Sequence, residues 1–310
     1  MKLPLSQEGE SLINNVSLTL GLIIPARNSM PYLTETIKSL EEQLESPDCI
    51  ILSDNCSTDG TTKLLKKFEK SSSIAKYVRT PEYLEIGPSF NFGISYCDCD
   101  WVLFLHSDDV LAKTAIKTIR QVLSKVDSEV GLVSFKAELI DENSKLVSAS
   151  VSKGRKKIQF GEKFISENWG TSSINFGAVV INRRIFYEVG GFDTQNSYWI
   201  DLKYYHKMVL KYKILRVPRI ILRYRTFSFE RNSDDRINFA KNNQEYWVNE
   251  YLQNLLKTHP SIKKLSNYQE SKYIYFVRVL IPFVLKKPLK LCLLKLRNFL
   301  DNTKFHDFPN

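Results

Sequence analysis

The sequence predicts an α/β fold with an open, mostly parallel sheet flanked by helices. Short apolar runs that end in polar residues or proline alternate with segments whose apolar residues recur every three to four positions. The runs are typical of buried parallel strands, and the periodic segments are typical of amphipathic helices. Strands that alternate with helices indicate an α/β sheet, and 310 residues with 43% hydrophobic content suffice for its core.

The first part of the chain contains four expected strands and three expected helices. The strands are residues 18–24, 49–52, 77–79 and 101–105, which are all rich in apolar side chains. The helices are residues 32–45, 61–70 and 90–96, and Thr34 is expected to cap the first of them. Strand and helix in strict alternation is the order found in an open α/β sheet.

The later part of the chain mixes both kinds of element. We expect helices at 110–126, 183–189 and from Asp201 to about 211, and strands at 131–141, 176–182 and 214–225. Residues 147–159 are polar and basic and are predicted to form a mobile loop, while Gly190 and Gly191 should end the helix before them. The chain is therefore divided into an α/β domain, 1–235, and a basic helical C-terminal extension, 236–310.

The excess positive charge lies in this extension. The formal net charge is +10, and from Lys263 onward ten Lys and Arg face three Asp and Glu among many leucines. No stretch there reaches the roughly 20 apolar residues that span a bilayer. The pattern is typical of a helix on an anionic membrane surface, with a helix packed on the α/β domain as the alternative. Nucleic-acid binding is not expected, because aliphatic residues rather than stacking aromatics accompany the charge.

The five cysteines indicate a reducing compartment. Their number is odd, and the polar N-terminal residues show no secretory signal. We therefore expect a cytoplasmic protein whose extension allows peripheral contact with the inner face of the cell membrane. Cys97 and Cys99 lack the second cysteine or histidine pair of a zinc site, so they are predicted to be small core side chains.

Polar residues cluster where three of the expected strands end. Residues 25–28 follow the first strand, residues 54–60 the second and residues 106–109 the fourth. In open α/β sheets, ligands bind at the carboxyl ends of the strands, where such loops converge. These three loops are therefore the predicted ligand site.

Four short motifs closely resemble those of the family 2 inverting glycosyltransferases. They are Leu-Ile-Ile-Pro-Ala-Arg-Asn at 22–28, Ser-Asp-Asn-Cys-Ser-Thr-Asp-Gly-Thr at 53–61, Phe-Leu-His-Ser-Asp-Asp at 104–109, and Gly-Gly-Phe-Asp at 190–193 followed by Trp-Ile-Asp at 199–201. Their order and spacing match over about residues 18–225, which makes the resemblance specific although each motif alone is weak.

The resemblance implies a GT-A fold and transfer of a hexosyl or deoxyhexosyl group from a nucleotide-diphosphate sugar to an acceptor hydroxyl. A saccharide or lipid-linked saccharide acceptor, in surface polysaccharide, lipopolysaccharide or O-antigen synthesis, fits the family members that the loop at 85–91 resembles. Asp54 would accept a hydrogen bond from the nucleotide base, with a turn-forming aspartate as the alternative. Pro25, Arg27 and Asn28 would lie beside the base or ribose.

Asp108 and Asp109 resemble the acidic metal-binding pair of the family. A divalent cation, Mn²⁺ or Mg²⁺, is therefore expected on the donor diphosphate, and Asp108 is also expected to contact the nucleotide sugar. His106 stands where the family often has an aspartate. It is a third candidate ligand that would favour Mn²⁺, and a structural histidine is the alternative.

Asp201 occupies the position of the general base in this family. An inverting transfer is a single displacement in which the acceptor hydroxyl loses a proton as it attacks. The family often has Glu-Asp here, where this chain has Ile200, and a helix N-cap is the alternative role for Asp201. Asp193 is the second candidate for the base and is also expected near the donor. Asn91 should either touch the donor or cap the following helix.

Two other functions remain as alternatives. A sugar-phosphate nucleotidyltransferase should carry a Gly-rich phosphate loop after the first strand, and residues 25–28 are no such loop. A catalytically inactive GT-A-like binding protein stays open, because His106 and Ile200 depart from the pattern of the family.

Overall fold

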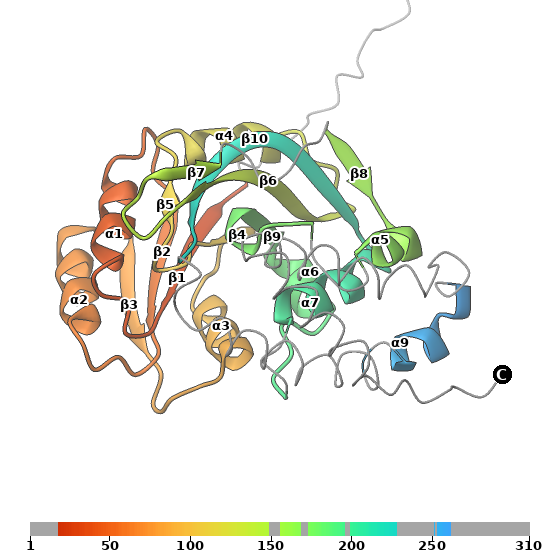
Figure 1. The fold of residues 1–310 in the computed structure, drawn as a ribbon, viewed down its shortest axis with the longest axis horizontal. Coiled ribbons are helices and arrows are strands. Elements are labelled where there is room, and N and C mark those ends of the chain that lie inside the picture. The colour runs from red at the N-terminus through yellow and green to blue at the C-terminus, as the bar shows by residue number, and fades with distance from the viewer. Residues whose placement is uncertain are drawn as a thin grey trace, which may run out of the picture.

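The computed structural model describes residues 18–148, 156–168, 173–195, 199–227, 251 and 253–261 (Figure 1). Within these ranges the strands form one ten-stranded sheet. The strand order is β3-β2-β1-β4-β9-β6-β10-β5, with β7 beside β6 and β8 beside β10. The expected α/β sheet with flanking helices is confirmed.

The first part of the chain forms the parallel side of this sheet. Its strands are β1 (Leu20–Ala26), β2 (Cys49–Asp54), β3 (Ala75–Arg79) and β4 (Trp101–Phe104), and they pair in parallel. The connecting helices are α1 (Leu33–Glu41), α2 (Thr61–Ser71) and α3 (Ile86–Ser95). Because the strands are parallel, the carboxyl ends of β1, β2 and β4 lie at the same edge of the sheet.

The later part of the chain adds strands of both directions. They are β5 (Val110–Leu111), β6 (Val130–Ile140), β7 (Leu146–Ser148), β8 (Lys157–Gln159), β9 (Val179–Asn182) and β10 (Lys213–Arg225). The helices are α4 (Ala115–Leu123), α5 (Gly161–Glu167), the short 3₁₀ turn η1 (Phe176–Ala178), α6 (Arg183–Glu188) and α7 (Ile200–Val209). β10 runs parallel to β6 and antiparallel to β5, which brings the end of β10 beside the loop after β4.

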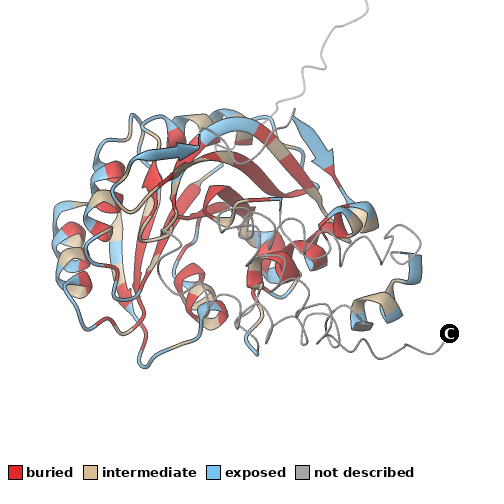
Figure 2. Ribbon diagram, in the orientation of Figure 1, coloured by how far each residue is buried: buried red, intermediate tan, exposed pale blue. Residues whose placement is uncertain are grey.

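A hydrophobic core lies on each face of the sheet. Neighbouring residues of β1 point to opposite faces, so Leu22 packs in the core shared with α1, α2 and α4, and Ile23 packs in the core shared with α3, α5, α6 and α7. Figure 2 shows the consequence, in which the central strands are largely buried while α1, α2 and α3 expose one surface. Because these strands are buried on both faces of the sheet, they appear in the sequence as continuous apolar runs.

The expected helix at 110–126 is wrong at its beginning. The structure places Val110 and Leu111 in the short strand β5 and begins α4 only at Ala115. Leu111 pairs with Leu222 of β10, and Val110 pairs with Arg223. A strand pairing with a partner more than 100 residues away is not visible in local periodicity, so the helical pattern was extended too far.

Smaller differences concern the ends of elements. α1 begins at Leu33 without a side-chain cap, so Thr34 does not cap it. α7 begins at Ile200 after Trp199, which has a left-handed backbone with a φ of 48°, and Asp201 therefore lies in the first turn of α7 rather than at its N-cap. The expected loop at 147–159 carries β7 and β8 at its ends, and residues 149–155 lie outside the described part.

The expected C-terminal extension lies almost entirely outside the described residues. Its described part contains α9 (Gln253–Thr258), while the cluster of basic residues and leucines after Lys263 is not described. Among the helices that the structure does describe, none is long and apolar enough to cross a membrane. The proposed membrane contact of the extension therefore stays a prediction.

Candidate functional site

Hydrogen bonds join the three loops at the carboxyl ends of β1, β2 and β4. The hydroxyl groups of Ser29 and Ser107 lie 2.7 Å apart, which connects the loop after β1 to the loop after β4. Asn28 Oδ1 accepts a hydrogen bond of 2.8 Å from the backbone N–H of Thr58, which connects it to the loop after β2. The ligand site expected from the sequence is therefore one contiguous region of the structure.

Asp54 is the last residue of β2 and is fully buried. Its Oδ2 accepts hydrogen bonds from Thr62 Oγ1 at 2.6 Å, Tyr77 Oη at 2.9 Å and Arg79 Nη1 at 2.6 Å, and its Oδ1 accepts from the backbone N–H of Ser57 at 2.9 Å. Burial pushes the pKa of Asp54 upward, but these hydrogen bonds outweigh it and leave the pKa below its usual value. Asp54 is thus a fixed carboxylate.

Arg27 and Asn28 lie at the exposed rim of the same region, directly after β1. The Arg27 guanidinium stacks over the ring of Tyr83, with its carbon 4.0 Å from the ring centre, and its Nη1 donates to the carbonyl of Asn55 at 3.4 Å. Asn28 has a φ of 46°, a conformation that asparagine tolerates better than most residues. Pro25 lies within β1 and is half-buried. The exposed Arg27 and Tyr83 form an aromatic and cationic surface beside Asp54.

The loop after β4 brings His106, Asp108 and Asp109 together. One potential ligand atom from each of the three side chains lies within 4.8 Å of the other two. His106 Nδ1 is 3.7 Å from Asp109 Oδ2. Asp109 is fully buried, and its Oδ2, like His106 Nε2, has no hydrogen-bond partner among the described residues. Two buried polar atoms without partners suit a cation site.

Burial shifts the pKa values of two of these candidate metal ligands, Asp109 and His106. Burial, together with the nearby charge of Asp108, raises the pKa of Asp109 well above its usual value. Burial lowers the pKa of His106, so its imidazole is neutral and able to coordinate a metal. A divalent cation would reverse the shift at Asp109, because it favours the ionised carboxylate. The residues present therefore fit the metal that the motif implies.

Arg225, at the end of β10, holds this loop in place. Its backbone N–H donates to Asp109 Oδ1 at 2.9 Å, and its Nε donates to the carbonyl of Asp108 at 2.8 Å. Its Nη1 donates to the carbonyl of Asp141 at 3.0 Å, and its Nη2 forms an ion pair with Glu35. Asp109 Oδ1 is thereby fixed, and Oδ2 is the oxygen left for a ligand. Arg225 is not among the site residues expected from the sequence, because it lies 116 residues after Asp109.

An aromatic cluster connects His106 to the Gly-Gly-Phe-Asp turn. The His106 ring packs edge-on against Phe90 of α3 and Phe176 of η1, with ring centres 5.9 and 5.2 Å apart. Phe192 packs on the same two phenylalanines at 5.9 and 5.5 Å. The loop that carries the acidic pair and the turn that leads to α7 therefore pack against the same two phenylalanines.

Asn91 and Gly87 of α3 fix this turn directly. Asn91 Nδ2 donates to the carbonyl of Phe192 at 2.9 Å, and its Oδ1 accepts from the N–H of Phe192 at 3.1 Å. A Cβ at Gly87 would lie only 1.9 Å from the carbonyl oxygen of Asp193, so only glycine allows this approach. Asn91 lies inside α3, so the expected helix-cap role is wrong, and its amide holds the turn.

Asp193 and Asp201 have different environments. Asp193 Oδ2 accepts a hydrogen bond of 2.6 Å from the amino group of Lys203, a side chain that is almost fully buried. The carboxyl of Asp201, in the first turn of α7, has its pKa raised by burial. Lys203 was not expected from the sequence, because a lysine in a helical pattern is usually solvated.

Comparison with known proteins shows the family of the chain. A family model described as "Glycosyl transferase family 2" matches residues 22–190, which is more than half of the chain. The chain belongs to glycosyl transferase family 2. The matched range includes the loops that carry Asp54, Asp108 and Asp109, and it ends at Gly190, before Asp201.

Three relatives of the chain are named as bacterial glycosyltransferases. The chain is 27% identical over 217 residues to the GalNAc(5)-diNAcBac-PP-undecaprenol beta-1,3-glucosyltransferase of Campylobacter jejuni, which covers 66% of this chain and 67% of that protein. It is 27% identical over 119 residues to the poly(ribitol-phosphate) beta-N-acetylglucosaminyltransferase TarS of Staphylococcus aureus, 37% of this chain and 21% of TarS. A match to the abequosyltransferase RfbV of Salmonella typhimurium is 30% identical and covers 34% and 33% of the two chains.

Solved structures show the same GT-A fold. The crystal structure of residues 1–349 of S. aureus TarS in complex with UDP has a TM-score of 0.56 at 18% identity and covers 67% of this chain and 61% of that chain. The structure of GalNAc-T7 with UDP, GalNAc and Mn²⁺ has a TM-score of 0.52 at 15% identity and covers 69% and 45%. The GT-A fold expected from the sequence is therefore confirmed.

Proposed function

We propose that the chain is an inverting, metal-dependent transferase that moves a hexosyl or deoxyhexosyl group from a nucleotide-diphosphate sugar to an acceptor hydroxyl. The observation that carries this proposal is the state of Asp109, of which one oxygen is held by the backbone of Arg225 while the other is buried without a partner in the described part of the chain. Burying a carboxylate oxygen without a partner is costly. A cation held by Asp109, Asp108 and His106 would offset that cost.

The proposed cation is Mn²⁺ or Mg²⁺. When bound, it neutralises the charge that develops on the leaving diphosphate. Asp109 and Asp108 would hold it through oxygen, and His106 would add a nitrogen, a donor set that suits Mn²⁺ better than Mg²⁺. Arg225 keeps the loop of these ligands in one conformation, because it donates to the carbonyl of Asp108 and to Asp109 Oδ1. Mn²⁺ in the structure of GalNAc-T7 supports the choice.

Asp201 is the proposed general base. The raised pKa of its carboxyl makes it a stronger base than an exposed aspartate, which suits removal of a proton from an acceptor hydroxyl. Asp193 is the weaker candidate, because the buried amino group of Lys203 already holds its carboxylate. We assign Asp193 and Lys203 a positioning role, since they join the Gly-Gly-Phe-Asp turn to the first turns of α7.

The nucleotide is proposed to lie over the loops after β1 and β2. Asp54 is a buried carboxylate at the end of β2, and Arg27 is an exposed cation that donates to the carbonyl of the next residue, Asn55. Arg27 and Tyr83 offer a planar surface for a base or ribose, and Asn28 and Pro25 shape the adjoining turn. The TarS structures with UDP and with UDP-GlcNAc support a UDP-sugar as the first donor to test.

The proposed acceptor is a saccharide or lipid-linked saccharide of a bacterial surface polymer. The undecaprenol-linked name of the Campylobacter relative supports an acceptor at a membrane. The basic residues after Lys263 would then bring a cytoplasmic enzyme to the anionic inner face of the membrane. The full chain should sediment with anionic vesicles at low salt and dissociate from them as the salt concentration rises. It should not sediment with neutral vesicles. Binding to neither kind of vesicle would contradict the membrane role.

Release of nucleoside diphosphate tests the proposed reaction. The full chain is incubated with Mn²⁺, Mg²⁺ or a chelator and with UDP-, GDP- and dTDP-sugars, and slow hydrolysis of the donor is measured without any acceptor. One class of nucleotide should be turned over, and only with a metal. Asp109→Asn should abolish both turnover and the metal-dependent rise in melting temperature that the nucleoside diphosphate causes in the parent chain.

Two results would overturn parts of the proposal. Undiminished turnover by Asp109→Asn would remove the metal assignment. Metal-dependent nucleotide binding without turnover of any donor, even after an acceptor has been supplied, would favour the inactive binding protein. Once an acceptor is found, the anomeric configuration of the product, measured by NMR, tests the inverting mechanism, and retention of configuration would exclude a single displacement at the sugar.

A further inference from the structure

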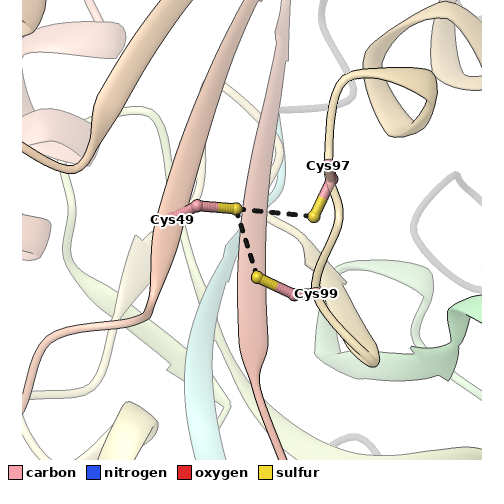
Figure 3. Close-up of side chains that lie close together, drawn as sticks. All are labelled: Cys49, Cys97 and Cys99. Atoms are coloured by element: carbon pink, nitrogen blue, oxygen red, sulfur yellow. Dashed lines mark hydrogen bonds between the residues drawn. The ribbon is translucent and has the colours of Figure 1, made fainter.

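Three cysteine sulfurs meet at the edge of the sheet opposite to the candidate functional site. Cys49 is the first residue of β2, and Cys97 and Cys99 lie in the connection from α3 to β4. Cys49 Sγ is 3.5 Å from Cys97 Sγ and 3.3 Å from Cys99 Sγ, and all three sulfurs lie within 4.8 Å of one another. Figure 3 shows the three side chains pointing toward a common centre from two separate segments.

Gly21 of β1 makes the space that the sulfurs occupy. It is paired with Cys49 in the sheet, so the strand passes directly beneath the cluster. A Cβ at Gly21 would lie 2.3 Å from Cys97 Sγ and 3.2 Å from Cys49 Sγ. Glycine within a strand weakens the strand and often marks a close approach by another group. Here the group that approaches is a set of three sulfurs.

The cluster has the composition and spacing of a site for a thiophilic metal ion. All three cysteines are free thiols. Tetrahedral coordination by thiolates about 2.3 Å from Zn²⁺ places neighbouring sulfurs about 3.8 Å apart, a few tenths of an ångström beyond the two shorter separations here. Soft thiolates select Zn²⁺ or Cu⁺ over Mn²⁺ and Mg²⁺. Cys97 and Cys99 are buried and Cys49 is half-buried, so Cys49 is the ligand most accessible to solvent.

We propose that Cys49, Cys97 and Cys99 form a second metal site, which binds one Zn²⁺ or Cu⁺ ion. The three sulfurs would supply three ligands and leave a further position for an exchangeable ligand. Binding displaces the thiol protons into the solvent and transfers no electrons. This site is separate from the proposed Mn²⁺ or Mg²⁺ site in both position and ligand type, so neither proposal depends on the other.

A bound ion would link two separate segments of the sheet. The ion would join the start of β2 to the connection before β4, across β1, which lies between these two strands in the sheet. An ion that binds only the folded chain raises its stability by mass action. The loops of the candidate functional site extend from the other ends of the same three strands, so the ion would hold these strands together without touching donor or acceptor.

Cobalt absorption tests the site in the full chain. The protein is stripped of metal under reducing, oxygen-free conditions and titrated with Co²⁺, whose thiolate complexes show sulfur-to-metal charge transfer in the near ultraviolet. The parent chain should develop this band with one equivalent, and Zn²⁺ should displace it. Copper(I) is added in a separate titration against a chromophoric chelator. Cys49→Ser and Cys97→Ser should lose the band and the metal-dependent rise in melting temperature.

Cys56→Ser is the matched control, because its sulfur contacts Thr80 and lies outside the cluster. Each variant is also made with Cys292→Ser, since Cys292 lies outside the described residues and must not contribute a ligand. If Cys97→Ser does not fold, the half-buried Cys49→Ser serves in its place. The proposal is overturned if the parent chain develops no charge-transfer band and binds no Cu⁺, if the band persists unchanged in Cys49→Ser, or if it disappears equally in Cys56→Ser.

Discussion

Replacing Arg225 with methionine should destabilise the chain and weaken metal binding together. Methionine keeps the backbone N–H that donates to Asp109 Oδ1, so the substitution removes only the contacts of the side chain. Those contacts include hydrogen bonds to the carbonyls of Asp108 and Asp141 and to Ser144 Oγ, at 2.8, 3.0 and 2.9 Å, and the ion pair with Glu35. The guanidinium is almost fully buried, so water does not replace it freely.

The size of the effect follows from what the substitution leaves behind. A buried acceptor without a partner costs about 1–3 kcal/mol, and removing one partner of a buried ion pair costs about 3–5 kcal/mol. Glu35 keeps 39% of its side-chain surface exposed, so solvent screens its charge and the lower end of the range applies. We therefore expect a loss of about 3 kcal/mol in the free energy of unfolding. At about 2–4 °C per kcal/mol, the melting temperature falls by roughly 6–12 °C.

Urea unfolding and Mn²⁺ titration are the measurements, with Arg223→Met as the matched control. Arg223 is in the same strand, but its side chain is more than half exposed and lies 3.6 Å from Glu138, a surface pair of small value. Arg225→Met should lower Mn²⁺ affinity because the Asp108 carbonyl is no longer held, whereas Arg223→Met should change neither quantity appreciably. Equal stability and equal Mn²⁺ affinity for Arg225→Met and the parent chain would refute the positioning role.

Three further outcomes test the site. Asp201→Asn should lower turnover by about 10²-fold or more with nearly unchanged donor affinity. At saturating metal, kcat of the parent chain should fall with decreasing pH through a pKa above the usual aspartate value of about 3.9, because only the ionised base accepts a proton. A fall in kcat only near that usual value would contradict the assignment of Asp201 as the base. Asp201→Asn should also resist urea better than the parent chain at pH 7, because a raised pKa of Asp201 in the folded chain means that folding disfavours the ionised carboxylate. This difference in stability should vanish below the pKa that the Asp201 carboxyl has in the unfolded chain. Gly87→Ala should lower the free energy of unfolding by about 1–3 kcal/mol and reduce turnover, because its Cβ would lie 1.9 Å from the carbonyl oxygen of Asp193. Gly60→Ala is the control, since the nearest atom to its Cβ is Cγ of the flexible Met30 side chain, at 3.3 Å. Equal unfolding curves for the two variants would exclude the clash at Gly87.

The parallel half of the fold, and the meeting of its polar loops at one edge of the sheet, were predictable from the sequence. β1, β2 and β4 are buried on both faces, so they appear as continuous apolar runs, and the polar loops that end them are equally visible. The motif that ends in Asp108 and Asp109 was recognisable because its residues are adjacent in the chain. The helical periodicity of α1, α2 and α4 is local as well, since it depends on residues three and four apart.

Errors arose where a distant partner decided the local structure. Val110 and Leu111 continue an apolar pattern that is compatible with a helix, but β10 offers them strand pairing. Asn91 is expected at the start of a helix at 90–96, but α3 begins at Ile86, so Asn91 lies inside α3 and its amide contacts Phe192. In both cases the competing partner comes from a segment about 100 residues or more away.

The sequence by itself determined the strand and helix alternation, the three converging loops and the resemblance to the family, because apolar periodicity and short motifs are properties of neighbouring residues. Only the tertiary structure decided that the backbone of Arg225 fixes one oxygen of Asp109, at a separation of 116 residues, and that Cys49 joins Cys97, at a separation of 48. Such contacts depend on the order and direction of strands in the sheet. That order is set by the packing of the whole domain, which no local pattern encodes.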